Sequence, residues 1–278
     1  MTNANAEQIE YWNGSGGERF ARHQQFIDYG LGLITDAALE KAAPAQGAVA
    51  LDIGCGCADT TIRLREMVGE HGAVMGVDVS QPMLRIARAR AHSAGLEIRF
   101  AEADAATFNF QPVFDLVFSR FGVMFFADPV AAFANIHRAL KPEGRLFFVC
   151  WRAADENAWS AIPFEAAREF LPPMEKGDPD APGPYAFADG GRVTHILEQA
   201  GFHDVRVEKL NSVMRLGSSL DAAAENALSL GPVARASSGA DEKTLTVVRE
   251  RIRAALAQYE TPDGIAAPAA CWLASAAR

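Results

Sequence analysis

The sequence predicts an α/β fold of the doubly wound type, with a mostly parallel sheet of seven strands, an N-terminal helical arm and a C-terminal helical insertion. Three observations lead to this prediction. Short apolar runs alternate with segments of helical periodicity between residues 48 and 151, and the first run ends in glycines that open a helix. The chain has 278 residues, 49% apolar and 22% charged, so it can fill a large core and is not disordered, collagen-like or coiled-coil.

Residues 1–47 form the predicted arm. The segment opens polar, and its apolar residues then recur at roughly helical spacing until Pro44 and Gly47 end the pattern. These apolar residues are Phe20, Phe26, Ile27, Leu31, Ile34 and Leu39. The segment therefore predicts helix and no strand.

The central segment, residues 48–151, repeats a unit of strand and helix. Its predicted strands are 49–53, 74–79, 96–101, 114–118 and 145–151. Its predicted helices are 60–68, 82–94 and 130–140, and the sequence Lys-Pro-Glu-Gly at 141–144 predicts a turn before the last strand. Because this alternation is typical of parallel strands with crossover helices, we expect both faces of the sheet to be covered.

Residues 152–278 complete the sheet and add the insertion. Two further strands are predicted at 205–210 and 269–276, and helices at 192–200, 221–230 and 242–259. Five prolines between residues 171 and 185 predict a long surface loop.

Charge and cysteine content limit the partners and the compartment. The chain carries 35 acidic and 26 basic residues, a net charge of −9, and the two signs are interspersed, so we expect no nucleic acid partner. Four cysteines without a signal-peptide pattern favour a reducing, cytoplasmic location. The longest apolar stretches, 121–126 and 146–151, are far shorter than the ~20 residues of a membrane span, so no membrane partner is expected.

The strongest motif is the glycine loop that follows the first predicted strand. Asp52, Gly54 and Gly56 stand between a strand and a helix, where glycines permit a tight turn and let backbone N–H groups approach a ligand. Asp78 ends the next strand, where a carboxylate can accept hydrogen bonds from a ribose diol. A purely structural turn is the alternative. An NAD(P)-dependent oxidoreductase is disfavoured, because Asp59 stands where the dinucleotide fingerprint needs glycine or alanine and no Tyr-x-x-x-Lys pair occurs.

Five ordered motifs together resemble the class I S-adenosylmethionine-dependent methyltransferases. The first is the acidic-x-Gly-x-Gly-x-Gly run, in which Ala58 replaces the third glycine. The others are the segments 76–84, 103–105, 114–117 and 140–145. The resemblance covers residues 48–151 well and the rest loosely, and it implies the Rossmann-like methyltransferase fold with S-adenosyl-L-methionine as the cofactor.

The resemblance also implies how the methionine half of the cofactor is held. Gly54 and Gly56 would let the backbone pass beneath it, and Asp52 would lie near its ammonium group. Ser119 and Arg120, at the end of the fourth strand, would lie beside the methionine moiety and the reacting methyl group.

The nucleoside half would be held by residues that follow the second and third strands. By the same resemblance, Asp78 would bind the ribose hydroxyls, Val79 and Met83 would pack on adenine, and Asp104 with Ala105 would meet the adenine amino edge. Core packing is the alternative role for Met83.

The arm and the insertion carry the remaining expectations. Tyr11 and Trp12 would cover the cofactor, although aromatic residues before a helix often only pack as a staple. Residues 1–47 would act as a lid, residues 48–151 as the cofactor-binding core, and residues 152–278 as the part that forms the acceptor pocket. No catalytic residue is assigned.

The predicted reaction is in-line transfer of the sulfonium methyl group to a small-molecule acceptor, with a non-catalytic S-adenosylmethionine-binding module as a further alternative. No metal is expected, because Cys55 and Cys57 have no second pair of ligands at zinc spacing. The N-terminal Asp-x-Met-Asn signature of the quinone-biosynthesis C-methyltransferases is absent, which argues against a quinone acceptor. The acceptor atom and the oligomeric state stay open.

Overall fold

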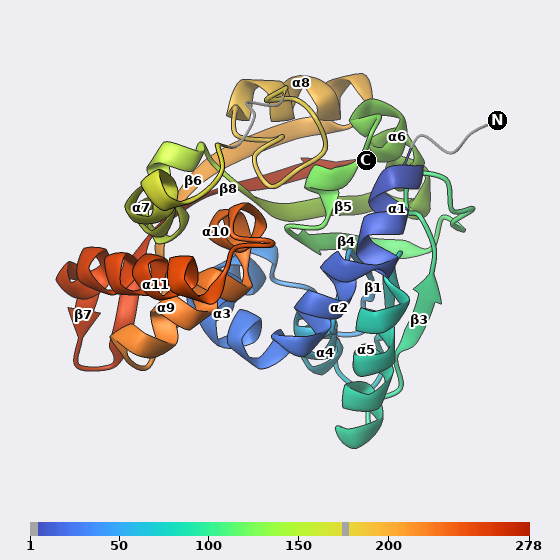
Figure 1. The fold of residues 1–278 in the computed structure, drawn as a ribbon. Coiled ribbons are helices and arrows are strands. Elements are labelled where there is room, and N and C mark those ends of the chain that lie inside the picture. The colour runs from blue at the N-terminus through green and yellow to red at the C-terminus, as the bar shows by residue number, and fades with distance from the viewer. Residues whose placement is uncertain (1–4, 174–177) are drawn as a thin grey trace.

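The computed structural model describes residues 5–173 and 178–278 and has one twisted sheet with helices on both faces (Figure 1). The strand order is β3-β2-β1-β4-β5-β8-β6, with the two-residue β7 paired to β8. The first five strands are parallel, whereas β8 is antiparallel to both β5 and β6. The strands are β1 Val49–Ile53, β2 Ala73–Asp78, β3 Arg99–Glu102, β4 Phe114–Arg120, β5 Leu140–Trp151, β6 His203–Gly217, β7 Glu260–Thr261 and β8 Gly264–Ala277.

The helices α3, α4 and α5 lie on one face of the sheet, and α6 and α8 on the other (Figure 1). The insertion between β6 and β8 supplies α9, α10 and α11, which pack near α7. The α-helices are α1 Ala6–Asn13, α2 Ser15–Arg22, α3 Gln24–Ala42, α4 Asp59–Val68, α5 Gln81–Ser93, α6 Pro129–Ala139, α7 Ala158–Ala167, α8 Gly190–Gln199, α9 Leu220–Ser229, α10 Gly231–Ala236 and α11 Glu242–Leu256. The 3₁₀ turns are Val123–Phe125, Ala154–Glu156, Arg168–Phe170 and Ala257–Tyr259.

Local chemistry explains where these helices begin. Ser80 caps α5 through its hydroxyl, with Pro82 in the first turn, and Asp128 caps α6 through its carboxylate, ahead of Pro129. Each cap satisfies an N–H group that the helix itself cannot pair. The helices therefore start at fixed points just beyond the carboxyl ends of the strands, which is where the site described below is built.

The fold class is confirmed, and the main sheet has the seven strands that the sequence predicts, with β7 in addition. The predicted turn at 141–144 is wrong, because these residues lie within β5. Leu140 pairs with Phe114, the register then shifts, and pairing resumes between Arg145 and Leu116. At a bulge of this kind, residues whose sequence is typical of a turn can lie within a strand.

Other boundaries also differ from prediction. The third strand lies at Arg99–Glu102 rather than 96–101, helix α7 was not predicted, and β6 extends far beyond the predicted 205–210. As an edge strand paired on one side, β6 keeps polar residues along much of its length, so apolar alternation does not reveal it. Part of the predicted loop, residues 174–177, lies outside the described residues.

The N-terminal segment divides into two parts. Helix α3 belongs to the hydrophobic core, where Ile34, Ala38 and Ala42 are fully buried. Helices α1 and α2 have no buried apolar side chain, and α2 packs against α5. None of the helices in residues 5–173 and 178–278 combines the length and the apolar character that a membrane span requires.

Candidate functional site

The glycine loop adopts a conformation that its residues make possible. Gly54, Gly56 and Ala58 all have positive φ, at 67°, 53° and 69°. A Cβ on Gly54 would lie 2.6 Å from the Cα of Gly122, so the loop after β1 and the loop after β4 touch through their backbones. Because only glycine allows both this approach and this φ, position 54 tolerates no side chain.

Asp52 is fully buried at the end of β1, directly beneath the loop. Its Oδ2 accepts hydrogen bonds from the hydroxyls of Thr60 and Thr61, both at 2.7 Å. Its Oδ1 has no hydrogen-bond partner in the described residues. Burial raises the pKa of this carboxyl to about 6, against the lowering effect of the two threonines. An unpaired buried carboxylate oxygen is costly unless a ligand donates to it.

Asp78 faces the same loop from the end of β2. Its Oδ2 accepts the N–H of Gly56 at 2.8 Å, and its Oδ1 accepts the N–H of Ser80 at 2.8 Å. Burial raises its pKa, and these N–H groups oppose that shift. Since each carboxylate oxygen has a further lone pair, Asp78 can also accept hydrogen bonds from a diol.

The predicted nucleoside wall is assembled at the ends of β2 and β3. Met83 is buried at the start of α5, with its sulfur 3.7 Å from the Cβ position of Gly56. Asp104 accepts the side-chain amide of Asn5 at 2.9 and 3.0 Å, and the Oδ1 of Asn5 accepts the N–H of Ala127 at 2.7 Å. The arm therefore bridges the loops that follow β3 and β4. Ala105 is buried beside this bridge.

A second asparagine holds the arm over the end of β2. The side-chain amide of Asn13 donates to the carbonyl of Val79 at 2.7 Å, and its oxygen accepts the N–H of Gln81 at 3.0 Å. The sequence alone assigns no role to either asparagine. Asn13 directly follows the Tyr11 and Trp12 pair, which is the one local signal that could have indicated it.

Trp12 makes edge-to-face contacts with Phe20 and Phe125, with ring centroids 5.1 and 5.2 Å apart. Phe125 belongs to the turn after β4, so the tryptophan ties the arm to the core. Tyr11 is 41% exposed and contacts Trp12 by its edge. The structure thus places Trp12 within the closed arm and leaves Tyr11 at its surface.

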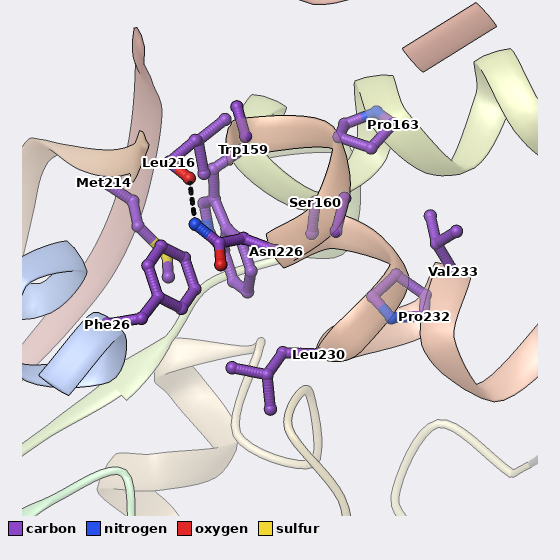
Figure 2. A pocket seen from close by; sticks show the side chains of 12 residues that line it. Phe26, Trp159, Ser160, Pro163, Met214, Leu216, Asn226, Leu230, Pro232 and Val233 are labelled. Carbon is purple, nitrogen blue, oxygen red and sulfur yellow. Dashed lines mark hydrogen bonds between the residues drawn. The ribbon is translucent and has the colours of Figure 1, made fainter. Parts of the chain in front are cut away.

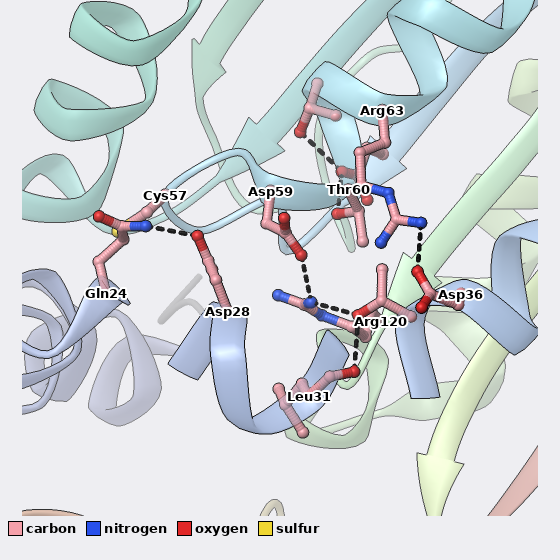
Figure 3. A network of polar contacts seen from close by, with 12 residues as sticks. Gln24, Asp28, Leu31, Asp36, Cys57, Asp59, Thr60, Arg63 and Arg120 are labelled. Atoms are coloured by element: carbon pink, nitrogen blue, oxygen red, sulfur yellow. Dashed lines mark hydrogen bonds and ion pairs between the residues drawn. The ribbon is translucent and has the colours of Figure 1, made fainter. Parts of the chain in front are cut away.

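Ser119 and Arg120 end β4, but both side chains are engaged by the protein. The Ser119 hydroxyl donates to the carbonyl of Ile53 at 2.7 Å and accepts the N–H of Gly122 at 3.2 Å. Arg120 reaches back to Asp59 and Thr35, each at 2.6 Å. Figure 3 shows this polar network joining α3 to the start of α4. Both residues fasten the walls of the site, and their predicted place beside the methionine moiety stays a prediction.

An aromatic stack leads away from the glycine loop. Phe121 has φ 61°, an uncommon value for a residue with a side chain, and its ring stacks on Trp151 at 4.1 Å and 11°. Trp151 in turn contacts Trp159, with centroids 5.0 Å apart. Strained residues of this kind gather at functional sites. The stack connects the loop after β4 with the pocket at Trp159.

That pocket is narrow, with a cavity volume of about 30 Å³. It lies between α3, α7, α9, α10 and β6, and Figure 2 shows Trp159 and Phe26 near its centre. None of the described residues that line it is charged. The Nδ2 of Asn226 donates to the carbonyl of Leu216, and the hydroxyl of Ser160 lies 2.7 Å from that of Tyr185. The lining residues are Phe26, Trp159, Ser160, Pro163, Met214, Leu216, Ala223, Asn226, Ala227, Leu230, Pro232 and Val233.

The cysteines of the loop are not arranged as a metal centre. Cys55 and Cys57 are free thiols, and burial raises the pKa of Cys57 to about 12 and that of Cys55 as well. The described part of the chain has no group of three or more His, Cys, Asp or Glu side chains that could hold a metal ion.

Taken together, the fold and the loop define an α/β protein in which a glycine loop and the acidic ends of β1 and β2 meet at the carboxyl ends of its parallel strands. Residues 50–144 match the family model described as a methyltransferase domain. The chain is 30% identical over 176 residues to a demethylmenaquinone methyltransferase of Lactobacillus johnsonii, an alignment that covers 59% of this chain and 72% of that protein. The chain belongs to the class I S-adenosylmethionine-dependent methyltransferases.

Other relatives carry related names. The chain is 42% identical over 128 residues to a demethylmenaquinone methyltransferase of Thermus thermophilus, which covers 46% of this chain and 56% of that protein. The chain thus spans little more than half the length of that relative. A nocamycin O-methyltransferase of Saccharothrix syringae is 29% identical over 189 residues, with 60% of this chain and 64% of that protein covered.

The fold has solved counterparts. A phosphoethanolamine N-methyltransferase 2 of Haemonchus contortus, in complex with phosphomonomethylethanolamine and S-adenosylhomocysteine, has a TM-score of 0.60 at 20% identity and covers 96% of this chain and 59% of its own. The [4+2]-cyclase SpnF has a TM-score of 0.53 at 21% identity, with 88% and 79% covered. These likenesses confirm the Rossmann-like fold. The predicted family and its cofactor, S-adenosyl-L-methionine, are confirmed as well.

Proposed function

We propose that this protein transfers the methyl group of S-adenosylmethionine to a neutral, largely apolar small molecule bound in the pocket beside Trp159. The observation that carries the proposal is the unpaired Oδ1 of Asp52 beneath a glycine cradle. It fits a cofactor with an ammonium group, because a buried carboxylate oxygen needs a donor. The aromatic stack from Phe121 to Trp159 joins this cradle to a pocket of the right character for the acceptor.

The chain's own residues would hold the cofactor along the loop. Asp52 would accept a hydrogen bond from the ammonium group, and Asp78 from the ribose hydroxyls. Met83 would pack on the adenine, and Asp104 would reach its amino edge once the Asn5 amide shares or yields that carboxylate. The helix pair α1 and α2 would exclude water from the reacting atoms through Trp12 and Asn13.

The reaction needs little beyond alignment of the two reactants. When bound, the sulfonium supplies an activated methyl group: the acceptor's electron pair forms the new bond to carbon while the sulfur keeps the electrons of the bond that breaks. The acceptor's proton is lost to water or buffer. Burial raises the pKa of Tyr185, so its hydroxyl stays protonated near neutral pH and can donate a hydrogen bond through Ser160. These hydroxyls would orient a polar group of the acceptor rather than deprotonate it.

The pocket lining restricts the class of acceptor. A phosphate or ammonium group that entered this pocket would lose its hydration and gain no charged partner, and this desolvation costs several kcal/mol of binding free energy. We therefore infer that phosphoethanolamine, whose methylated form is bound by the Haemonchus protein of similar fold, is not the acceptor here. A quinol-type ring agrees with the names of the demethylmenaquinone relatives, although this chain lacks the Asp-x-Met-Asn signature.

Methyl transfer can be tested with S-adenosylmethionine carrying a labelled methyl group and paired acceptors. We expect label in 1,4-naphthoquinol or 1-naphthol and none in phosphoethanolamine. Label in phosphoethanolamine alone would overturn the apolar acceptor. Binding of NADPH but not of S-adenosylhomocysteine would overturn the methyltransferase function, and S-adenosylhomocysteine binding without transfer to any apolar acceptor would favour a non-catalytic module.

A filled-pocket variant tests the location of the acceptor. Ala227→Trp would occupy the pocket, so methyl transfer should fall by orders of magnitude while S-adenosylhomocysteine binds as before. Ala254→Trp places the same ring on the exposed face of α11 and should change neither. Equal transfer by the two variants would move the acceptor site elsewhere.

A further inference from the structure

Two helices that pack together where the arm meets the core each carry two arginines. Arg19 and Arg22 belong to α2, and Arg85 and Arg88 belong to α5, the helix against which α2 packs (Figure 1). Within residues 5–173 and 178–278, none of the four forms an ion pair. Three of them, Arg22, Arg85 and Arg88, are exposed.

A groove runs between the same two helices. It is open to solvent and has a volume of about 530 Å³, and Arg22 and Arg85 line it from opposite helices. Its apolar residues are Ala21, Pro82 and Ile86, and Glu18 is the one acidic residue among the described residues that line it. The groove thus has one wall from the arm and one from the core.

The electrostatics of the seam oppose closure of the arm. When α2 docks on α5, Arg22 of the arm and Arg85 of the core line the same groove, and like charges that face one another repel. Within the arm, the pKa of His23 at the end of α2 is lowered by burial and then by Arg22 and Arg19. A multivalent anion between the helices would replace this repulsion with attraction on both sides.

We propose that the α2–α5 groove binds a phosphate-bearing anion that spans Arg22 and Arg85 and thereby holds the arm closed over the cofactor. Arginine is suited to this ligand because its planar guanidinium donates two parallel hydrogen bonds to a phosphate. The five residues predicted to touch the nucleoside do not line the groove, so the anion is a separate ligand; they are Asp78, Val79, Met83, Asp104 and Ala105.

Closure would couple the anion to cofactor exchange. The same α1–α2 segment carries Asn5, Asn13 and Trp12, which contact the loops after β2, β3 and β4. An anion that favours the docked arm therefore slows the release of S-adenosylhomocysteine, and by linkage the bound cofactor raises the affinity for the anion. The inference concerns the arm and holds whichever acceptor the pocket takes.

Hydrogen exchange of residues 6–22 in the full-length protein with bound S-adenosylhomocysteine tests the proposal. We expect millimolar sodium pyrophosphate to slow this exchange by about fivefold or more relative to sodium chloride of equal ionic strength, the size of a modest allosteric coupling. A second experiment compares vesicles that contain phosphatidylglycerol with phosphatidylcholine vesicles. Slower exchange with pyrophosphate identifies a free anion as the ligand, and slower exchange with anionic vesicles alone identifies a lipid headgroup. Exchange of residues 6–22 that is no slower than in sodium chloride, in both experiments, overturns the proposal.

Charge variants make the test specific. The exposed arginines allow Arg22→Gln with Arg85→Gln, which should abolish the anion effect without changing the melting temperature. Arg22→Glu supplies an anionic group from the arm itself, so it should slow the exchange of residues 6–22 without pyrophosphate. Lys243→Glu, an exposed change on α11, should behave as the parent. An anion effect that survives the Arg22→Gln and Arg85→Gln changes would place the ligand elsewhere and refute this site.

Discussion

Replacement of Asp52 by asparagine tests the proposed role of its carboxylate, because this group titrates in a range where binding can be measured. The carboxyl is fully buried, its pKa is raised to about 6, and its Oδ1 has no partner in the described residues. An ammonium group beside Oδ1 would favour the ionised form, so cofactor binding should require loss of the proton.

The size of the effect follows from that pKa. At pH 5 only about one tenth of the free protein would have Asp52 ionised, so S-adenosylhomocysteine should bind about tenfold more weakly at pH 5 than at pH 7.5, or about 1.4 kcal/mol. Asp52→Asn removes a charge-assisted hydrogen bond of ~1.5–3 kcal/mol, so at pH 7.5 affinity should fall by about 10- to 150-fold. Its dependence on pH should shrink as well.

Isothermal titration calorimetry with S-adenosylhomocysteine between pH 5 and pH 7.5 measures both effects. Asp78 has a raised pKa and faces the same loop, so Asp78→Asn is run beside Asp52→Asn to separate the two titrations. Asp36→Asn, at an exposed ion pair with Arg63, is the matched control and should keep the parental profile. A parental affinity that is flat across this range, or an Asp52→Asn profile as steep as the parent's, would refute the reasoning.

Four further outcomes are expected. Without cofactor, Asp52→Asn should melt at a higher temperature than the parent at pH 7.5. The pKa of Asp52 is raised in the folded state, so the free energy of unfolding of the parent falls by up to ~3 kcal/mol as the pH rises from ~4 to about 6, and the variant does not undergo this loss. A lower melting temperature of the variant would contradict this. Gly54→Ala should lose cofactor binding and more stability than Gly56→Ala in urea unfolding, because its Cβ would lie 2.6 Å from Gly122, whereas that of Gly56 would lie 3.7 Å from Met83; equal losses would argue against a tight contact. Deletion of residues 1–22, which spares the core helix α3, should leave a cooperative melt that still shifts with S-adenosylhomocysteine, while methyl transfer falls by orders of magnitude. Trp12→Ala should reproduce part of that fall. Loss of the cooperative melt would show that α1 and α2 belong to the core. Phe121→Leu should weaken the binding of 1-naphthol more than the binding of S-adenosylhomocysteine, because the Phe121 ring belongs to the stack that leads to the pocket. Tryptophan fluorescence measures both affinities. An equal effect on the two ligands would place Phe121 in the cofactor site alone.

The sequence predicted most of the cofactor side of the molecule because that side is encoded locally. The glycine loop, the acidic ends of β1 and β2 and the order of strands and helices each depend on residues that are adjacent in the chain, so pattern and spacing suffice. The predicted turn at 141–144 failed because a bulge set by the partner strand β4 overrides the local preference for a turn. The predicted strand 205–210 is shorter than β6, because pairing with β8, rather than the residue pattern of β6 itself, makes this segment a strand.

What the sequence by itself determined is the fold class, the glycine loop between β1 and α4 and the family, all of which follow from short segments of the chain. Only the tertiary structure decided that Asn5 and Asn13 hold the arm, that Arg120 turns toward Asp59, and that Trp159 stands at the end of an aromatic stack. It also decided that Arg22 and Arg85, far apart in the sequence, line one groove. The physical reason is that these contacts join residues many positions apart, and their partners are chosen by packing and burial, which no local pattern records.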